Sequence, residues 1–273
     1  MKIVFSWLGA VLVLCGLGSA VAWRLSGGQW ERVETPSMGT VAPVGTLLWV
    51  QPVEFSSLRV GDFITFHPPG HSELTYSHRV FTLNVDGTVT TKGVLTAPDP
   101  WRLTSRDVVG KVAARWWGVG WLVQAAPLLG VGALLLWLLC WKAVAHHLRL
   151  PVAIVGTSVL LSLVILIYRP LVRAEQLSFA QSSNGARATY VSTGMLPLRL
   201  QAVHGGAVNL RDGESGSVLA TRPDLHGRYQ VGLHAHLPLS RWLVLGLVCF
   251  LPALWTLIVG MPPAKEPQHA AAL

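Results

Sequence analysis

The chain has 273 residues, of which 51% are hydrophobic and only 12% charged, and its formal net charge is +8 at pH 7. This balance indicates an integral membrane protein. The basic residues are dispersed, with no Lys/Arg run long enough for a nucleic-acid footprint, so we expect no nucleic-acid partner and assign the positive charge to lipid headgroups.

Four apolar runs are each long enough to cross about 30 Å of hydrocarbon as a helix. We expect an N-terminal transmembrane anchor at 1–24, further spans at 116–142, 150–168 and 241–260, and a cytoplasmic tail at 261–273. All three cysteines lie inside these runs, which argues against a disulfide framework. Tryptophans near the span ends are expected to form interfacial belts and not core: Trp23, Trp116, Trp117, Trp121, Trp141 and Trp242.

The first run ends in Ala20-Val21-Ala22, which also resembles the cleavage site of a secretory signal. Its apolar stretch of about 20 residues exceeds a typical signal core, so we expect an uncleaved anchor; cleavage would leave three spans. The basic loop between the second and third spans predicts that this loop is cytoplasmic. Segments 30–115 and 170–240 are then both extracytoplasmic, although Arg24, Arg169 and Arg173 on that side oppose the assignment.

Short β-prone runs separated by turn residues predict strands in both extracytoplasmic segments. In the first they are Thr46–Val50, Phe63–His67, His78–Asn84, Thr88–Lys92 and Val108–Ala113, with Asp86-Gly87 as a hairpin turn. In the second they are Leu196–Val203, Ser217–Ala220 and Tyr229–His236. The expected fold class is therefore a membrane protein of α + β type, with four transmembrane helices, a mostly β domain at 30–115 and a small β-rich segment of unknown function at 170–240.

Three short segments carry the chemistry. Thr35-Pro36-Ser37-Met38 holds a serine behind a stiff proline, Ser77-His78-Arg79-Val80 holds a histidine, and Thr91-Lys92-Gly93 leads to Pro98-Asp99-Pro100. Each is a weak signal alone. In this order and at these separations, and with Pro43-Val44-Gly45 and Val60-Gly61-Asp62 between them, they resemble the type I signal peptidases. The similarity is to the branch of endoplasmic reticulum, archaea and Gram-positive bacteria, which uses histidine where the usual bacterial enzyme uses lysine.

The resemblance implies a role for each residue. Ser37 would be the nucleophile, His78 the general base, and Asp99 the carboxylate that orients the imidazole and stabilises the imidazolium. The backbone N–H of Ser37 and the hydroxyl of Thr35 would stabilise the oxyanion. Asp62 would be structural, and no metal or organic cofactor is implied.

The sequence departs from the family pattern around two of these residues. Gly39-Thr40 replaces a pair that usually ends in proline, and Pro36 replaces a common glycine. Val94 stands where a second aspartate is usual, Leu95-Thr96 replaces a polar pair, and Asp99 lies one residue early. Two other chemistries stay open: Lys92 as the base of a Ser/Lys dyad, and metal binding by His234 and His236, which lie two apart in a predicted strand.

The function implied is a serine endopeptidase of the cell membrane, or of the endoplasmic reticulum in a eukaryote, that cleaves N-terminal signal peptides from exported proteins after small residues. Its partners would be signal-peptide-bearing preproteins, the lipid bilayer and the protein export machinery. One alternative is an inactive homologue that binds exported proteins without cleaving them. Another is a surface-assembly protein or receptor whose working part is 170–240.

Overall fold

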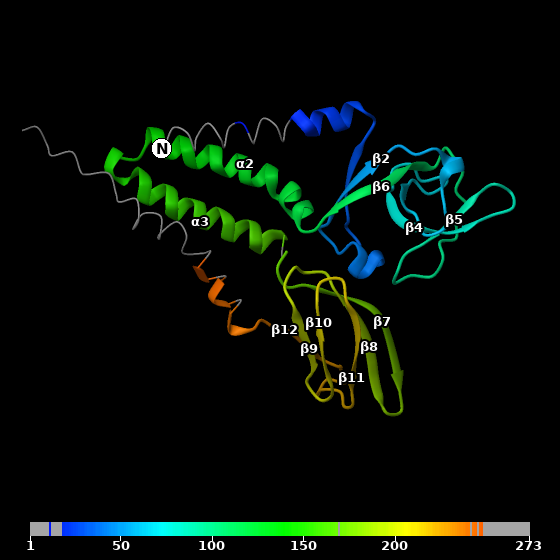
Figure 1. The fold of residues 1–273 in the computed structure, drawn as a ribbon. Coiled ribbons are helices and arrows are strands. Elements are labelled where there is room, and N and C mark those ends of the chain that lie inside the picture. Colours follow the sequence, from blue (N-terminus) through cyan, green and yellow to red (C-terminus); the bar gives the residue numbers. More distant parts are fainter. Residues whose placement is uncertain (1–10, 12–17, 169, 241, 245, 248–273) are drawn as a thin grey trace, which may run out of the picture.

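The computed structural model describes residues 11, 18–168, 170–240, 242–244 and 246–247. It has three parts: a first β unit, a pair of long helices and a second β unit (Figure 1). The fold is therefore α + β with mostly β sheets, as expected from the sequence.

The first β unit is one antiparallel sheet with the strand order β1-β2-β6-β3-β4-β5. All five predicted strands of this segment are present, and β1 was not predicted. The strands are β1 (Gln29–Arg32), β2 (Leu47–Gln51), β3 (Phe63–Phe66), β4 (Tyr76–Leu83), β5 (Val89–Lys92) and β6 (Val108–Trp116). The Asp86-Gly87 turn joins β4 to β5 as predicted: Gly87 has φ +79°, and the Asp86 carboxylate accepts from the Thr88 amide at 3.1 Å.

Two apolar clusters form the core of this unit. One includes Leu48 and Val50 of β2 together with Met38 from the 3-10 helix η1 (Pro36–Val41). The other includes Ile64, Phe66, Val80, Val89 and Leu103. Alternate residues of the strands supply these side chains, because successive side chains of a strand point to opposite faces. Met38 of η1 belongs to the first cluster and Val80 of β4 to the second, and β3 contributes to both clusters, so the core links η1 to β4. The elements η1 and β4 each carry a residue of the predicted site.

The helices α2 (Val119–Lys142) and α3 (Arg149–Tyr168) lie side by side and are joined by a short segment containing the 3-10 helix η3 (His146–Leu148) (Figure 1). Gly132 faces Leu160, and Gly156 faces Leu136, so each helix receives a leucine at a glycine of the other. Such small-residue contacts let helices approach closely. Both helices are long and apolar enough to cross a membrane. The spans expected at 1–24 and 241–260 fall largely outside the described residues, although residues 18–25 are helical.

Trp121 does not belong to an interfacial belt. It is only 7% exposed and packs against Gly45, whose φ of +85° and missing side chain make room for the indole. The belt prediction is therefore wrong for Trp121, because this residue joins the first turn of α2 to the first β unit. Trp116 also has a local role, since it stacks on Trp49 with ring centroids 4.8 Å apart.

The second β unit consists of two three-stranded antiparallel sheets, ordered β11-β8-β7 and β10-β9-β12. The predicted strands correspond to β9, β11 and β12, whereas β7, β8 and β10 were not predicted. The bounds are β7 (Ala174–Ser182), β8 (Gly185–Ser192), β9 (Leu198–Ala202), β10 (Ala207–Leu210), β11 (Ser215–Ala220) and β12 (Val231–Ala235). Its core contains Leu198, Leu200, Ala202, Leu210, Val218 and Ala220.

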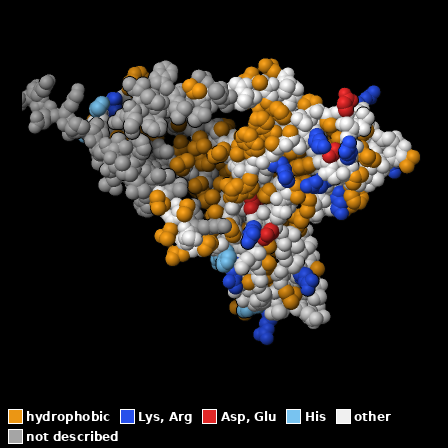
Figure 2. Space-filling model, viewed as in Figure 1, with side chains coloured by type: hydrophobic (Ala, Val, Ile, Leu, Met, Phe, Trp, Pro, Cys, Tyr) orange, Lys and Arg blue, Asp and Glu red, His pale blue; other side chains and the backbone are white. Residues whose placement is uncertain are grey.

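Both β units lie at the same end of the helical pair, because β6 leads into α2 and α3 leads back to β7 (Figure 1). Figure 2 shows apolar side chains gathered over the helices up to this junction, and Lys and Arg side chains gathered on the first β unit. Both β units therefore lie beyond one end of an apolar helical hairpin.

Candidate active site

Ser37 lies in the first turn of η1, at the surface of the first β unit. Thr35 precedes the helix in an extended conformation, and Pro36 occupies its first position, where the missing N–H and fixed φ of proline are compatible with a helix start. The next residue, Met38, is 1% exposed and anchors the turn in the core. This alternation leaves Ser37 accessible on a rigid backbone.

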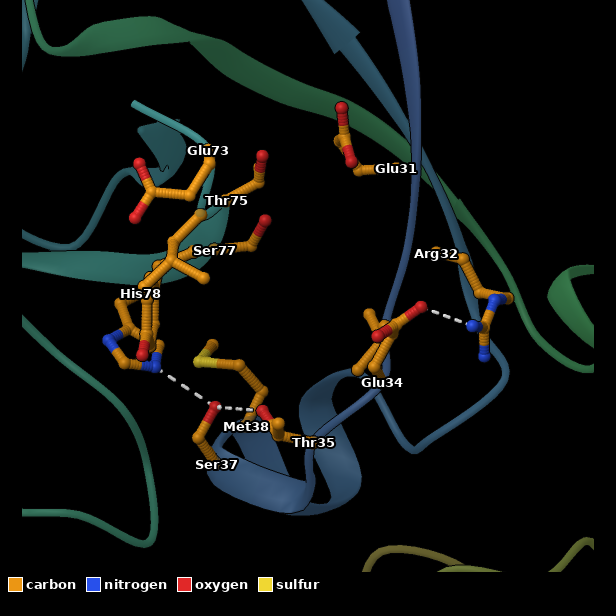
Figure 3. Close-up of a pocket in the computed structure, with 13 residues that line it drawn as sticks. Glu31, Arg32, Glu34, Thr35, Ser37, Met38, Glu73, Thr75, Ser77 and His78 are labelled. Atoms are coloured by element: carbon orange, nitrogen blue, oxygen red, sulfur yellow. Dashed lines mark hydrogen bonds and ion pairs between the residues drawn. The ribbon is translucent and has the colours of Figure 1, made fainter. Parts of the chain in front are cut away.

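The structure brings Ser37, His78 and Asp99 together. His78 Nε2 is 2.9 Å from Ser37 Oγ, and His78 Nδ1 is 2.7 Å from Asp99 Oδ2 (Figure 3 shows the serine and histidine). The His78 and Asp99 side chains are 4% and 8% exposed. In a neutral imidazole whose Nδ1 donates to the carboxylate, Nε2 is free to accept the serine proton. This is the arrangement of a serine nucleophile with an oriented base.

Thr91 completes the hydrogen-bonded chain. Its hydroxyl donates to Asp99 Oδ2 at 2.6 Å, and its carbonyl accepts from the Asp99 backbone amide at 2.8 Å. Thr91 is fully buried, so water does not compete for these bonds. The sequence analysis used Thr91 only as a landmark in the Thr-Lys-Gly string. This role depends on the pairing of β5 with β4, in which Thr91 lies opposite Val80, and that register is not readable from the sequence.

Gly93 lets the nucleophile and base approach each other. A Cβ at this position would lie 2.9 Å from the Ser37 carbonyl oxygen and 3.3 Å from His78 Nε2. Two residues later, the Leu95 amide donates to the same Ser37 carbonyl at 2.9 Å. The segment after β5 therefore holds the Ser37 peptide from one side. Sequence reasoning assigned no role to Gly93.

The aromatic rings around His78 restrict its imidazole. Phe66 and Tyr76 meet it edge-on, with centroid separations of 6.2 and 5.9 Å. Both rings belong to strands flanking or containing His78, so its orientation is fixed by the sheet as well as by Asp99. An oriented base needs less reorganisation during proton transfer.

Thr35 lies next to the nucleophile, with its Oγ1 3.5 Å from Ser37 Oγ (Figure 3). The two hydroxyl groups are therefore neighbours. Gly39 interrupts η1 with φ +51° and ψ −133°, a conformation in which a side chain is strained. The Gly39-Thr40 departure therefore has a structural reason in this chain.

The second departure is also accommodated. Val94, which stands in place of a second aspartate, is 46% exposed, and Leu95 packs over Gly39. Asp99 alone accepts from the imidazole. The shortened spacing before Asp99 is compatible with the β-bridge between Lys92 and Pro98, which positions the carboxylate beside Thr91.

A groove of about 490 Å³ opens beside Ser37 and His78. It runs between residues 31–38, which comprise the end of the edge strand β1 and the segment after it, and residues 73–78, which lead into β4 and form its first residues. Carboxylates line it, from Glu31, Glu34 and Glu73 (Figure 3). Burial raises the pKa of Glu31, despite the opposing positive charge nearby. The groove is open and flanked by the strands β1 and β4, so extended backbone borders it on two sides, which suits an extended peptide.

Lys92 does not reach the nucleophile as a base would. Alternation along β5 puts it on the face opposite Thr91, and its ammonium lies 5.5 Å from the Phe81 ring centroid. Asp62 pairs with Lys111 at 2.7 Å, consistent with a structural role.

Among the residues that the structure describes, no three His, Cys, Asp or Glu side chains are grouped to hold a metal, and His234 and His236 thus lack a third ligand there.

No protein-family model matches this sequence, and no curated protein matches it either. The functional argument therefore rests on the geometry of the site.

Proposed function

We propose that the chain is a membrane-anchored serine endopeptidase that removes N-terminal signal peptides from exported proteins after small residues. The observation that carries this proposal is the continuous hydrogen-bonded chain from Ser37 through His78 and Asp99 to Thr91. A binding protein needs no buried histidine–carboxylate pair behind an accessible serine. The inactive-homologue alternative therefore has less support.

The geometry suits acyl transfer. Ser37 Oγ attacks the scissile carbonyl carbon while His78 Nε2 takes the hydroxyl proton, and Asp99 stabilises the imidazolium that forms. The oxyanion is met by the Ser37 backbone N–H and the Thr35 hydroxyl. His78 then gives its proton to the leaving amine, which departs with the new N-terminus. Water, activated by the same imidazole, hydrolyses the acyl-enzyme and restores Ser37.

The groove and the helices support the choice of substrate. An extended peptide can pair with backbone along a sheet edge, and β1 is an edge strand bordering the groove. Both β units extend from one end of the apolar helical pair. A bilayer around α2 and α3 would put the groove on one side of the membrane, near the point where a signal helix emerges. Preproteins, the bilayer and the export machinery are the partners in this proposal.

The test is cleavage of several preproteins by the full-length protein in lipid nanodiscs, with product N-termini identified by mass spectrometry. We expect cleavage after a small residue, reduced by about 10³-fold or more in Ser37→Ala. Ser105→Ala, at an exposed turn before β6, is the matched control and should retain activity. Absence of cleavage by the folded wild-type protein, or cleavage unaffected by Ser37→Ala, would contradict the proposal.

A further inference from the structure

The turn between β10 and β11 is built rigidly. The Glu214 side chain accepts from the Arg211 amide at 2.9 Å, and the Glu214 amide donates to the Arg211 carbonyl at 2.9 Å. Gly213 has φ +75°, and its amide donates to the Ser192 carbonyl at 3.0 Å. The turn Arg211–Glu214 is therefore fixed to the end of β8 within the second β unit.

This turn touches the backbone of η1 directly. A Cβ on Gly213 would lie 2.5 Å from the Gly39 carbonyl oxygen and 2.8 Å from the Thr40 amide nitrogen. A Cβ on Gly39 would in turn lie 3.3 Å from the Gly213 carbonyl oxygen. Both glycines are buried, and side chains are excluded from the contact. The Gly39–Thr40 peptide begins two residues after Ser37.

Two further contacts join the second β unit to the residues just before α2, and one of them is made by the turn itself. Trp117 Nε1 donates to Asp212 Oδ2 at 2.6 Å. Met195, from the loop between β8 and β9, packs at Gly118, where a Cβ would lie 2.9 Å from the methionine Cε. These contacts join the second β unit to the junction between β6 and α2, so the turn has a defined position relative to η1.

We propose that the second β unit is a positioning element for the nucleophile. Its Arg211–Glu214 turn packs on the Gly39–Thr40 peptide, and the Leu95 amide donates to the Ser37 carbonyl, so η1 is clamped by two other parts of the chain. Gly213 acts through η1 on the Ser37 hydroxyl and amide and touches no substrate. The inference rests on the proposed peptidase function and gives segment 170–240 a role in it.

The clamp matters because the reacting serine tolerates little displacement. A misplacement of about 1 Å costs about 10²-fold in rate. Gly213→Ala would push the turn away from Gly39, and it would also add strain at a positive φ. Gly227→Ala controls for the strain, since Gly227 has φ +74° in the same β unit and no atom lies within 4 Å of its Cβ position.

The experiment compares wild type, Gly213→Ala and Gly227→Ala by kcat, by KM and by hydrogen exchange of residues 36–41. We expect kcat to fall about 10- to 100-fold in Gly213→Ala, with little change in KM and faster exchange in η1. Gly227→Ala should match wild type in all three. Equal kcat and equal exchange in the two variants would overturn the proposal.

A milder variant keeps the test decisive if Gly213→Ala does not fold. Trp117→Phe keeps an aromatic ring, smaller than the indole, and removes the donor to Asp212; Trp137→Phe on α2, with the same loss of ring size, is its control. We expect faster exchange in residues 36–41 for Trp117→Phe alone, and unchanged exchange would overturn the clamp. If the wild-type protein cleaves no preprotein, the peptidase proposal fails, but the exchange measurement still decides whether the turn holds η1.

Discussion

The first β unit buries a hydrogen-bonded chain of polar side chains that runs through His78, Asp99 and Thr91, whereas the core cluster described for the second is apolar. The second unit also buries Ser192 and Thr193, but within the described part of the chain their hydroxyls take part in no such hydrogen-bonded chain. In the first, His78 and Thr91 are buried on adjacent strands. In the second, β9 alternates buried Leu198, Leu200 and Ala202 with exposed residues. Burying a polar group costs stability unless the group is hydrogen-bonded. A buried polar side chain therefore indicates a position whose residue type serves something other than core packing. The contrast is consistent with the proposal that the first unit carries the chemistry and the second supports it.

The largest predicted effect comes from removing the charge of Asp99, the carboxylate that accepts from His78 in the first β unit. Asp99→Asn should lower kcat about 10³- to 10⁴-fold, because the amide disfavours the imidazole tautomer needed by Ser37 and cannot stabilise the imidazolium. Thr91→Val, which removes only the hydroxyl bonded to Asp99, should cost about 10-fold. Steady-state kinetics on a preprotein peptide measures both. Asp86→Asn at the exposed β4–β5 turn is the control, and a loss as large as that of Asp99→Asn would refute a specific role for Asp99.

One glycine-to-alanine substitution in each β unit compares the two units directly, with a predicted loss of kcat smaller than that of Asp99→Asn. Gly93→Ala would place a Cβ 2.9 Å from the Ser37 carbonyl oxygen, so we expect about 10²-fold lower kcat and about 1–3 kcal/mol lower free energy of unfolding. Gly206→Ala, whose nearest atom would be 3.9 Å away in the second unit, should change neither. Kinetics and chemical denaturation test both variants. Equal behaviour of the two would show that close approach at Gly93 is unimportant.

The smallest predicted effect concerns the boundary between the units. Burial raises the pKa of Asp212 to about 6, against hydrogen bonds from Trp117 and the Gly213 amide that lower it. Arg211 from the same turn and Arg115 from β6 line the cavity of about 670 Å³ beside it. Because the folded state binds this proton more tightly than the unfolded state, stability should fall as pH rises from about 4 to 6.

Asp212→Asn removes that titration and keeps an acceptor for Trp117. We expect its Tm at pH 7.5 to exceed that of wild type by about 2–4 °C, with the two values converging near pH 4. Thermal denaturation by circular dichroism at a series of pH values is the measurement. Parallel Tm curves for both proteins across this range would show that Asp212 titrates normally.

Strands were predictable where alternation and turn residues coincide. The β4–β5 hairpin follows from β-prone runs around Asp86-Gly87, and β9 from the regular alternation of Leu198–Ala202. The strands β1 and β7 lack such a pattern: β7 is largely exposed on both faces, and its pairing with β8 defines it instead. A strand held mainly by its neighbour gives little signal in its own sequence.

Only those residues of the site that lie in short sequence motifs were predictable. Ser37, His78 and Asp99 were named from short segments, and the structure brings the three together, while their catalytic roles stay a prediction. No role in the site was assigned to Gly93 or Gly213, because their importance depends on which backbone lies opposite them. Trp121 was placed wrongly for the same reason: its position at a span end is the same whether it faces lipid or Gly45.

Because a short connection joins α2 to α3, the contact between the two β units can be much smaller than an interface between separate proteins. Two separate proteins need about 800 Å² per partner for a stable interface, far more than one turn resting on one peptide bond. Here the helical hairpin holds both units at one end, so docking is intramolecular, and the effective local concentration reaches the millimolar range or above. A contact as small as that of the turn on η1 can therefore keep the two units together, although the same contact between separate proteins would not.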